Sequence, residues 1–201
     1  MQNNNIPIYS PNDFVGMRKA GSLAAKILDK LQQIIQPGIS TLKINDYCHK
    51  MIVENNATPA PLNYKGFPKS ICTSVNHIVC HGIPSQNKIL QDGDIINIDV
   101  TVILNNWHGD SSRMFVAGKP NRKSFALLQA TYECLLIGIK HALPGKHLGD
   151  IGYNIQQYAE EKNYSVVRDF CGHGIGREFH TAPSILHYGN EGEGPKLKPG
   201  M

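Results

Sequence analysis

Two aspartates, Asp99 and Asp110, lie in neighbouring runs of strand-forming residues and are the first candidates for chemistry in this sequence. Val, Ile and Thr dominate the first run, which reaches Leu104, and the second run begins at Trp107. Two asparagines, at positions 105–106, separate the runs, and paired asparagines tolerate the positive φ angles of a tight hairpin turn. The sequence therefore predicts an antiparallel hairpin with one aspartate on each strand.

A two-residue loop decides which residues of this hairpin face each other. Asp99 then lies opposite Ser112, and Thr101 lies opposite Asp110. Because side chains alternate between the faces of a strand, both aspartates lie on one polar face as diagonal neighbours, roughly 7 to 8 Å apart at the backbone. Hard oxygen ligands at this spacing suit a pair of divalent cations about 3.5 to 4 Å apart. From the hairpin alone, a solvated polar face with two unrelated aspartates is an equally good interpretation.

Three histidines in glycine-flanked segments are the other candidates. His173 and His180 lie in CGHGIGREFHTAP, and His81 lies in VCHGIP. Their spacing differs from the i, i+4 pair of an HExxH zinc site, and nearby glycines let the backbone approach a ligand. A surface or core role is more frequent for any single histidine, but three of them with the paired aspartates favour a metal hydrolase. Cys80 and Cys171, each close to a histidine, leave a thiol hydrolase as an alternative.

The composition is ordinary for a soluble globular protein: of 201 residues, 41% are hydrophobic and 18% are charged. The net charge of +4 comes from scattered basic residues, so no specific nucleic-acid surface is expected. The N-terminus MQNNNIPIYS has no charged region followed by an apolar one, and no segment has the length of a membrane span. Five cysteines without CxxC spacing do not fit a disulfide framework. We expect a cytoplasmic protein without a membrane partner.

Four amphipathic helices are predicted around the hairpin. The first begins at Ser10-Pro11 and ends before the Pro-Gly pair at 37–38, and the second runs from Thr41 to the asparagines at 55–56. The third and fourth are expected at about 121–142 and 148–162. The third helix has a stripe of apolar residues that is expected to face inward: Phe125, Leu128, Tyr132, Leu135, Leu136 and Ile139. Short strands are predicted at 70–75, 78–80 and 164–168.

The order of these elements indicates an internal repeat. The two Pro-Gly pairs, at 37–38 and 144–145, are 107 residues apart, and each lies between two amphipathic helices. The same offset places Gly93 on Gly200, although identity between the copies is slight. At this offset the chain ends where the second copy of the hairpin should begin. We therefore expect a shortened form of a longer protein.

Four separated motifs agree, in order and spacing, with one enzyme family. The chain resembles bacterial type I methionine aminopeptidases in CHGIP, GDIINIDVTV, WHGDSSRMF and CGHGIGREFH, and the resemblance extends from about Ser10 to Met201. It implies an α+β pita-bread fold, in which two pseudo-symmetric αβ halves surround an antiparallel sheet. Residues 1–201 would form a single domain, with residues 11–118 as the first half and residues 121–201 as an incomplete second half.

The resemblance also implies roles for individual residues. Asp99, Asp110 and His173 correspond to metal ligands of the family, whose intact members hold two divalent ions; Co, Mn, Fe and Zn all remain open. His81 and His180 correspond to the histidines that contact the scissile amide and its tetrahedral intermediate. The lining of the pocket for the methionine side chain corresponds to Tyr64, Phe67, Cys72 and Phe179. Phe67 and Pro61 stand where bacterial members often have Tyr and Cys, so the pocket shape differs while its apolar character is kept.

The implied activity is removal of N-terminal methionine from nascent polypeptides, by a monomer for which the ribosome is a further candidate partner. The family completes its metal site with two glutamates on later strands that this sequence does not contain. Weak or absent activity is therefore expected for the chain as given. The alternative is a pita-bread relative that has lost catalysis and serves as a binding module, which is disfavoured because every ligand position within the chain holds a competent residue.

Overall fold

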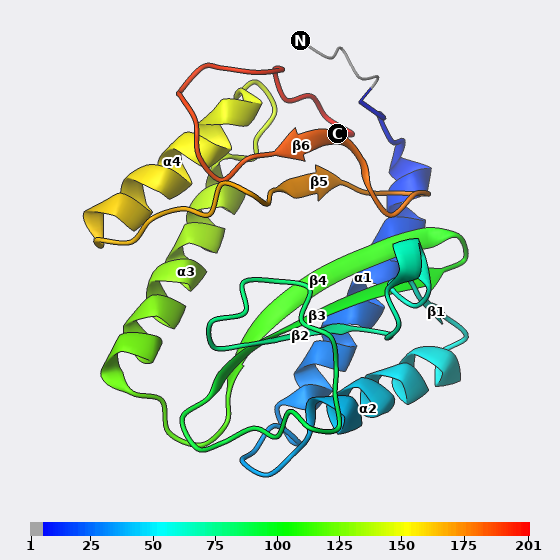
Figure 1. The fold of residues 1–201 in the computed structure, drawn as a ribbon. Helices are drawn as coiled ribbons and strands as arrows, with labels where there is room; N and C mark the ends of the chain where they lie inside the picture. The colour runs from blue at the N-terminus through cyan, green and yellow to red at the C-terminus, as the bar shows by residue number, and fades with distance from the viewer. Residues whose placement is uncertain (1–5) are drawn as a thin grey trace. The chain divides into compact units, whose positions relative to one another are not determined.

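The computed structural model describes residues 6–201, which form two compact units (Figure 1). Residues 12–124 together with 176–179 form one unit, here called the hairpin unit. The described residues up to Pro11, residues 125–175 and residues 180–201 form the other, here called the histidine unit. The division of a single domain into halves 11–118 and 121–201 stays a prediction.

The hairpin unit is built on a four-stranded antiparallel sheet. β3 (Ile95–Leu104) pairs along its whole length with β4 (Trp107–Val116), while its other edge pairs with β2 (Cys72–Val75) and β1 (Thr58–Pro59). Asn105 and Asn106 form the turn with φ angles of 51° and 62°, as a two-residue hairpin requires. The predicted register is confirmed, with Asp99 opposite Ser112 and Thr101 opposite Asp110.

Two helices, α1 (Pro11–Leu31) and α2 (Thr41–Glu54), complete the core of this unit (Figure 1). Ile27 and Leu28 of α1 are buried, as are four core-facing side chains of β3: Ile96, Ile98, Val100 and Val102. Glycines permit the close approach of α1 to the hairpin, because a Cβ on Gly109 would lie 2.2 Å from the backbone carbon of Ala20. Arg113, which points to the apolar side, reaches the edge of the sheet and pairs with Asp29 at 2.7 Å.

The histidine unit contains most of α3 (Arg122–His141), α4 (Leu148–Glu161) and a two-stranded sheet of β5 (Gly172–Gly174) and β6 (Thr181–Ile185). The helices meet where Gly138 faces Ile155. Asp150 secures the loop that follows β6: its carboxylate accepts hydrogen bonds from the backbone N–H groups of Gly192 at 2.7 Å and His147 at 2.8 Å. The start of α4 and residues 186–194 are thereby joined.

Hydrogen bonds confirm the predicted repeat at the offset of 107 residues. Gly38 donates its N–H to the Leu90 carbonyl at 2.8 Å, and Gly145 donates to the Leu197 carbonyl at 2.9 Å. The isolated bridge between Ser40 and Ile89 recurs at residues 147 and 196. The two copies therefore use the same backbone connections after their first helix.

Backbone conformation repeats in the same way. Asn56 and Asn163 end the second helix of each copy with φ angles of 56° and 61°. Gly93 and Gly200 have φ angles of 88° and 95°. Asparagine and glycine are the residues that enter this left-handed region most easily. The second copy thus follows the first closely until its last residues.

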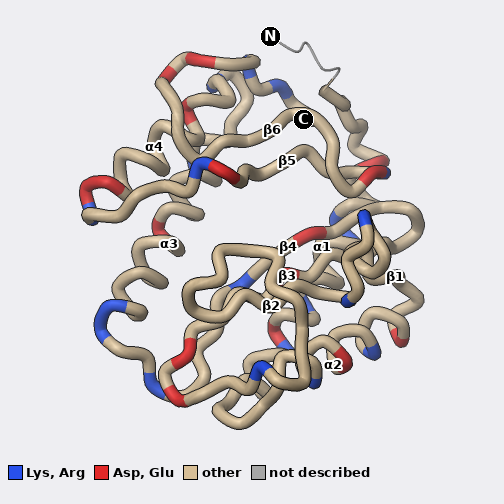
Figure 2. The backbone as a smooth tube through the Cα atoms, in the orientation of Figure 1, with Lys and Arg blue, Asp and Glu red and all other residues tan. Residues whose placement is uncertain are grey.

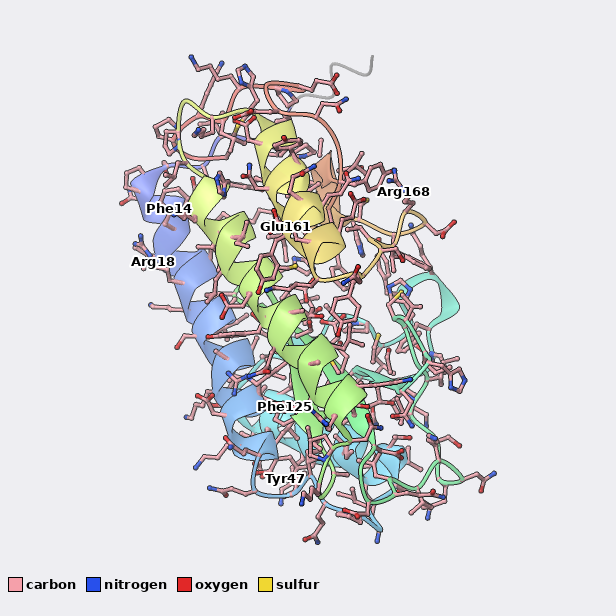
Figure 3. All side chains as sticks on the ribbon, turned by 90° about the vertical axis from the view of Figure 1, so that its left-hand side faces the viewer. Phe14, Arg18, Tyr47, Phe125, Glu161 and Arg168 are labelled. Atoms are coloured by element: carbon pink, nitrogen blue, oxygen red, sulfur yellow. The ribbon has the colours of Figure 1, made fainter. Side chains whose placement is uncertain are left out.

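The predicted inward stripe of α3 is wrong for most of its members. Phe125, labelled in Figure 3 in the first turn of α3, is 51% exposed, and Leu135 and Ile139 are 55% and 61% exposed. Tyr132 and Leu136 are also exposed. Of the six stripe residues, only Leu135 has a buried counterpart in α1, Leu28. The strands of the described part of the histidine unit are β5 and β6 alone, and they leave most of this stripe uncovered.

Two of the predicted short strands are also wrong. Residues 164–168 form no strand, although their counterparts in the first copy include β1. β1 exists because Thr58 and Pro59 pair with β3, and the described second copy has no strand equivalent to β3. Residues 78–80 follow a turn in which Ile78 donates to the Val75 carbonyl, and they join no ladder. Three observed strands lie outside the predicted ones: β1, β5 and β6.

Charged residues of both signs are distributed along the whole described chain (Figure 2). No helix within residues 6–201 combines the length and the apolar character needed to cross a membrane.

Candidate metal centre and active site

Asp99 and Asp110 are adjacent on the polar face of the hairpin. Their carboxyl groups share a hydrogen bond, and the Thr101 hydroxyl donates to Asp110 Oδ1 at 2.9 Å. Asp99 also lies between its cross-strand neighbours Cys72 on β2 and Ser112 on β4. Three strands therefore fix this carboxylate pair, and the spacing follows from the two-residue turn.

The electrostatics of the pair favour a cation. Withdrawal of the Asp99 carboxyl from water, and next the charge of Asp110, raise the pKa of Asp99 to about 7. Two carboxylates in contact repel each other when both are ionised unless a positive charge lies between them. Carboxylate oxygens on a rigid sheet are suitable ligands for divalent ions. The donor set at Asp99 and Asp110 thus fits the predicted metal.

His173, the predicted third ligand, lies on β5 in the histidine unit. Its Nδ1 is 3.0 Å from the Gly174 carbonyl, and because a carbonyl only accepts, Nδ1 carries the hydrogen. With the hydrogen on Nδ1, Nε2 is the ring nitrogen that bears the lone pair, as in many metal-binding histidines. The ring of His180 lies close by, with 4.1 Å between ring centroids. The histidine unit therefore brings His173 and His180 together.

The structure does not by itself assemble a complete ligand set. Within residues 6–201, no three His, Cys, Asp or Glu side chains are grouped as a metal site. Asp99 and Asp110 belong to the hairpin unit, and His173 belongs to the histidine unit. The membership of His173 in one site with the two aspartates stays a prediction.

His81 is held in an unusual backbone conformation beside β2. Its φ of 55° lies in the left-handed region, which non-glycine residues rarely enter. The next residue, Gly82, accepts a hydrogen bond from Thr73 at 2.8 Å and donates one to the Ser74 hydroxyl at 3.1 Å. A Cβ on Gly82 would lie 2.2 Å from the Thr73 carbonyl oxygen. Strained backbone conformations that the surrounding structure enforces are frequent at functional sites. Here the strained residue is His81, whose side chain is exposed.

The hairpin unit also contains the four residues predicted to line the methionine pocket. Tyr64 lies in a short 3-10 turn, η1 (Tyr64–Gly66), and its ring is tilted against Phe179 at 4.9 Å between centroids. Phe67 closes that turn by donating its N–H to the Tyr64 carbonyl. Cys72 is 7% exposed beside Asp99. Tyr64 and Phe179 are thus in ring contact, and Cys72 is adjacent to the carboxylate pair.

The thiol-hydrolase alternative loses support from the environment of Cys80. Burial, followed by the charge of Asp99, raises the pKa of this thiol above its ordinary value. Burial raises the pKa of Cys72 further, to about 12. A nucleophilic cysteine needs a stabilised thiolate. The negative charge of Asp99 destabilises the thiolate of Cys80 instead, which disfavours a nucleophilic role.

One residue of this region was not recognised as a candidate from the sequence. His108 is 8% exposed, and its ring stacks on Phe179 with 5.7 Å between centroids. Its neighbour in space is 71 positions further along the chain, a pairing for which the sequence gives no signal.

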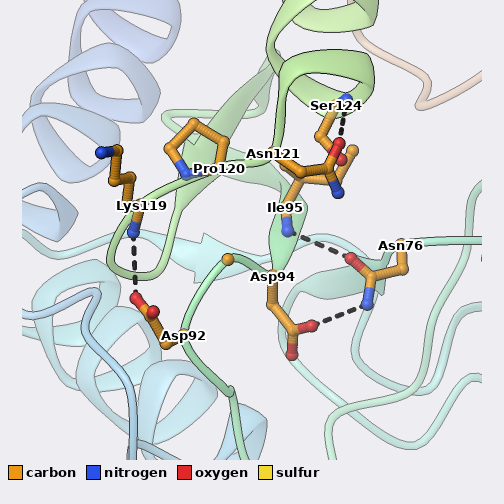
Figure 4. A pocket seen from close by; sticks show the side chains of 9 residues that line it. Asn76, Asp92, Asp94, Ile95, Lys119, Pro120, Asn121 and Ser124 are labelled. Atoms are coloured by element: carbon orange, nitrogen blue, oxygen red, sulfur yellow. Dashed lines mark hydrogen bonds between the residues drawn. The ribbon is translucent and has the colours of Figure 1, made fainter.

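A separate polar pocket of about 640 Å³ lies where β3 begins and β4 ends (Figure 4). Its polar side chains bond to one another and to the surrounding backbone: Asp92 accepts from the Lys119 N–H, and Asp94 accepts from Asn76. None of the predicted metal, histidine or pocket residues lines it. It is therefore distinct from the candidate site.

Comparison with known proteins shows the family of this chain. The sequence profile of metallopeptidase family M24 matches residues 15–201. Methionine aminopeptidase of Rickettsia prowazekii is 58% identical over 98% of this chain and 75% of that protein, and the Escherichia coli K12 enzyme is 47% identical over 98% and 75%.

Solved structures show the same relationship. The crystal structure of the Rickettsia prowazekii enzyme superposes with a TM-score of 0.96 over 98% of this chain and 79% of its own, at 58% identity. That of Thermotoga maritima methionine aminopeptidase gives 0.95 over the same shares, at 34% identity. Prolidase from Pyrococcus furiosus, at 23% identity and a TM-score of 0.81, shares the fold. The chain has the pita-bread fold and belongs to metallopeptidase family M24, whose methionine aminopeptidases use two divalent metal ions.

Proposed function

We propose that this chain is a metal-dependent aminopeptidase that removes methionine from the N-termini of nascent polypeptides. The observation that carries the proposal is the half-buried Asp99–Asp110 carboxylate pair, in which the two acids are hydrogen-bonded to each other and held by three strands. Relatives named methionine aminopeptidase, at 47% to 58% identity across 98% of the chain, support the substrate class.

The residues proposed to hold metal are Asp99, Asp110 and His173, the last through Nε2. When bound there, divalent ions would act as Lewis acids and lower the pKa of a water molecule for attack on the scissile carbonyl. Donors of this kind accommodate Co, Mn, Fe and Zn alike.

The histidines divide the remaining work between the two ends of the scissile bond. His81 would donate to the departing nitrogen, since its strained backbone fixes the direction of an exposed ring. His180 would stabilise the oxyanion that forms from the carbonyl, a role in which a fixed donor lowers the barrier. Its ring is already oriented by contact with His173.

The specificity for methionine would come from the apolar pocket of the hairpin unit. Tyr64, Phe67 and Phe179 offer aromatic surface, and a thioether makes favourable contacts with aromatic rings. The thiol of Cys72 remains neutral because its pKa is about 12, so the pocket keeps its apolar character beside Asp99. We place the reaction in the cytoplasm, with a monomer acting on emerging chains near the ribosome.

Metal binding is the primary test, because it does not depend on turnover. Calorimetry with MnCl₂ should give a saturable heat that Asp110→Ala abolishes. Asp29→Ala is the matched control, since Asp29 lies in the same unit but pairs with Arg113 instead. Unchanged Mn²⁺ binding in Asp110→Ala would contradict the assigned ligand pair.

Hydrolysis of a Met-Ala-Ser peptide then separates the enzyme from the non-catalytic binding module. An aminopeptidase releases free methionine in a metal-dependent reaction that chelator stops and that is lost on His81→Ala. A binding module would hold metal or peptide without any methionine release, even at high protein concentration.

A further inference from the structure

The segment Gly176–Phe179 is attached to the tip of the β3–β4 hairpin, although 68 residues separate Gly176 from His108 along the chain. The Gly176 carbonyl accepts two hydrogen bonds from His108, from its backbone N–H at 2.9 Å and from ring Nδ1 at 3.1 Å. Since a carbonyl cannot donate, Nδ1 carries the hydrogen in this contact. One residue of the hairpin thus holds the segment by both its backbone and its side chain.

The other end of the segment is held by aromatic contacts. The His108 ring stacks on Phe179 with an interplanar angle of 17° and 5.7 Å between centroids. Phe179 in turn meets Tyr64 at 4.9 Å. Three rings therefore form a row, and the central one belongs to the segment. Any displacement of His108 changes the support of Phe179.

A third contact lies on the other side of the hairpin tip. The Arg177 guanidinium lies 3.9 Å from the centre of the Trp107 ring, and its Nη1 lies 3.5 Å from the Asn105 carbonyl. Cation–π contacts of this kind add stability at a partly exposed site. Trp107 is the single tryptophan of the chain, so its fluorescence reports on this segment.

We propose that His108 is a positioning residue that sets the specificity of the methionine pocket by holding Phe179 against Tyr64. This rests on the proposed function, in which Phe179 and Tyr64 form a wall of that pocket. His108 touches no substrate in this role. His108 limits the movement of Phe179 and so keeps the shape of the pocket. An unbranched apolar side chain that fits this shape then binds more tightly than a side chain that does not fit.

Fluorine NMR tests the positioning directly. Labelling with 4-fluorophenylalanine gives six resonances, and Phe179→Leu assigns the one of interest. His108→Ala should shift or broaden the Phe179 resonance and move Trp107 emission to longer wavelength. His141→Ala is the matched control, because His141 also bonds a backbone carbonyl through Nδ1, that of Ile137 at 2.9 Å, but lies in the histidine unit.

Affinity for L-methionine, measured by calorimetry at fixed Mn²⁺, tests the pocket role. Loss of the ring hydrogen bond and stacking should weaken binding roughly 3- to 10-fold in His108→Ala. His108→Asn, which restores a donor at the position of Nδ1, should recover part of the affinity, and His108→Phe, which restores the ring, should recover another part. A purely structural role would give no such graded recovery.

The outcomes separate this proposal from the proposed function. An unchanged Phe179 resonance in His108→Ala overturns the positioning role, and a shifted resonance with unchanged methionine affinity overturns its effect on specificity. If the parent chain binds no methionine while Phe179 still responds to His108, the proposed function fails and the effect on specificity fails with it, whereas the support of Phe179 by His108 stands.

Discussion

Asp99 on β3 and Asp110 on β4 share a hydrogen bond between their carboxyl groups on the polar face of the hairpin. Burial and the neighbouring charge raise the pKa of Asp99 from an ordinary value of 3.8 to about 7. A raised folded-state pKa means that the metal-free protein loses stability as the pH rises from about 3.8 toward 7. The pair therefore destabilises the fold at neutral pH until a cation is bound.

Removal of the metal should therefore lower the free energy of unfolding. At pH 8, saturating Mn²⁺ should raise the free energy of unfolding by about 2.7 kcal/mol at one hundred times Kd, and EDTA should reverse the change. Asp110→Asn should abolish the metal effect while leaving the EDTA-treated protein at least as stable as the parent, because one of two adjacent charges is gone. Thermal unfolding followed by circular dichroism measures both. If Asp110→Asn is less stable than the parent in EDTA, the proposed repulsion between Asp99 and Asp110 is contradicted.

Gly16 in α1 should tolerate no side chain, because a Cβ there would lie 2.1 Å from a ring atom of Trp107. We expect Gly16→Ala to destabilise the protein by about 1 to 3 kcal/mol through overpacking. Gly21→Ala in the same helix meets no atom within 4 Å and should stabilise by about 0.4 to 1 kcal/mol. Urea unfolding of both variants gives the comparison, and equal effects would contradict the close approach of α1 to β4.

Leu28 and Leu135 occupy equivalent positions of the repeat but differ in environment, with 1% and 55% of their surfaces exposed. Leu28→Ala should cost about 2 to 5 kcal/mol, since it leaves a cavity in the core. Leu135→Ala should change the free energy of unfolding by no more than about 0.5 kcal/mol. Chemical denaturation decides this, and a large loss at Leu135 would mean that the face of α3 is covered in solution.

The stabilisation that Asp150 provides should depend on pH. Hydrogen bonds from the Gly192 and His147 N–H groups hold the pKa of its carboxyl below its usual value. A lowered pKa contributes stability that is present above the unfolded value of 3.8 and is lost as the pH falls through the folded value. Asp150→Asn should therefore lower the urea midpoint at pH 7, and the difference from the parent should shrink in acid. Glu161→Gln, at the other end of α4, should show neither effect.

The hairpin was predictable because its determinants are local. Asn105 and Asn106 fix a two-residue turn, and alternation then places Asp99 and Asp110 on one face without reference to the rest of the chain. The repeat was predictable for a related reason, since Pro-Gly pairs and helix periodicity recur at one offset. Strands at 164–168 and 78–80 were predicted wrongly because a strand needs a partner, which composition does not supply.

The sequence by itself determined the order of the helices, the register of β3 and β4, and the residue types that could hold a metal, because turn chemistry and periodicity act over a few residues. Only the tertiary structure decided which distant groups meet: Cys72 beside Asp99, Gly176 and Phe179 on His108, and α1 against Gly109. It also decided that Leu28 is buried while Leu135 is exposed. An apolar stripe in the sequence indicates that a helix face can be buried. Whether that face is buried depends on whether another element of the fold packs against it.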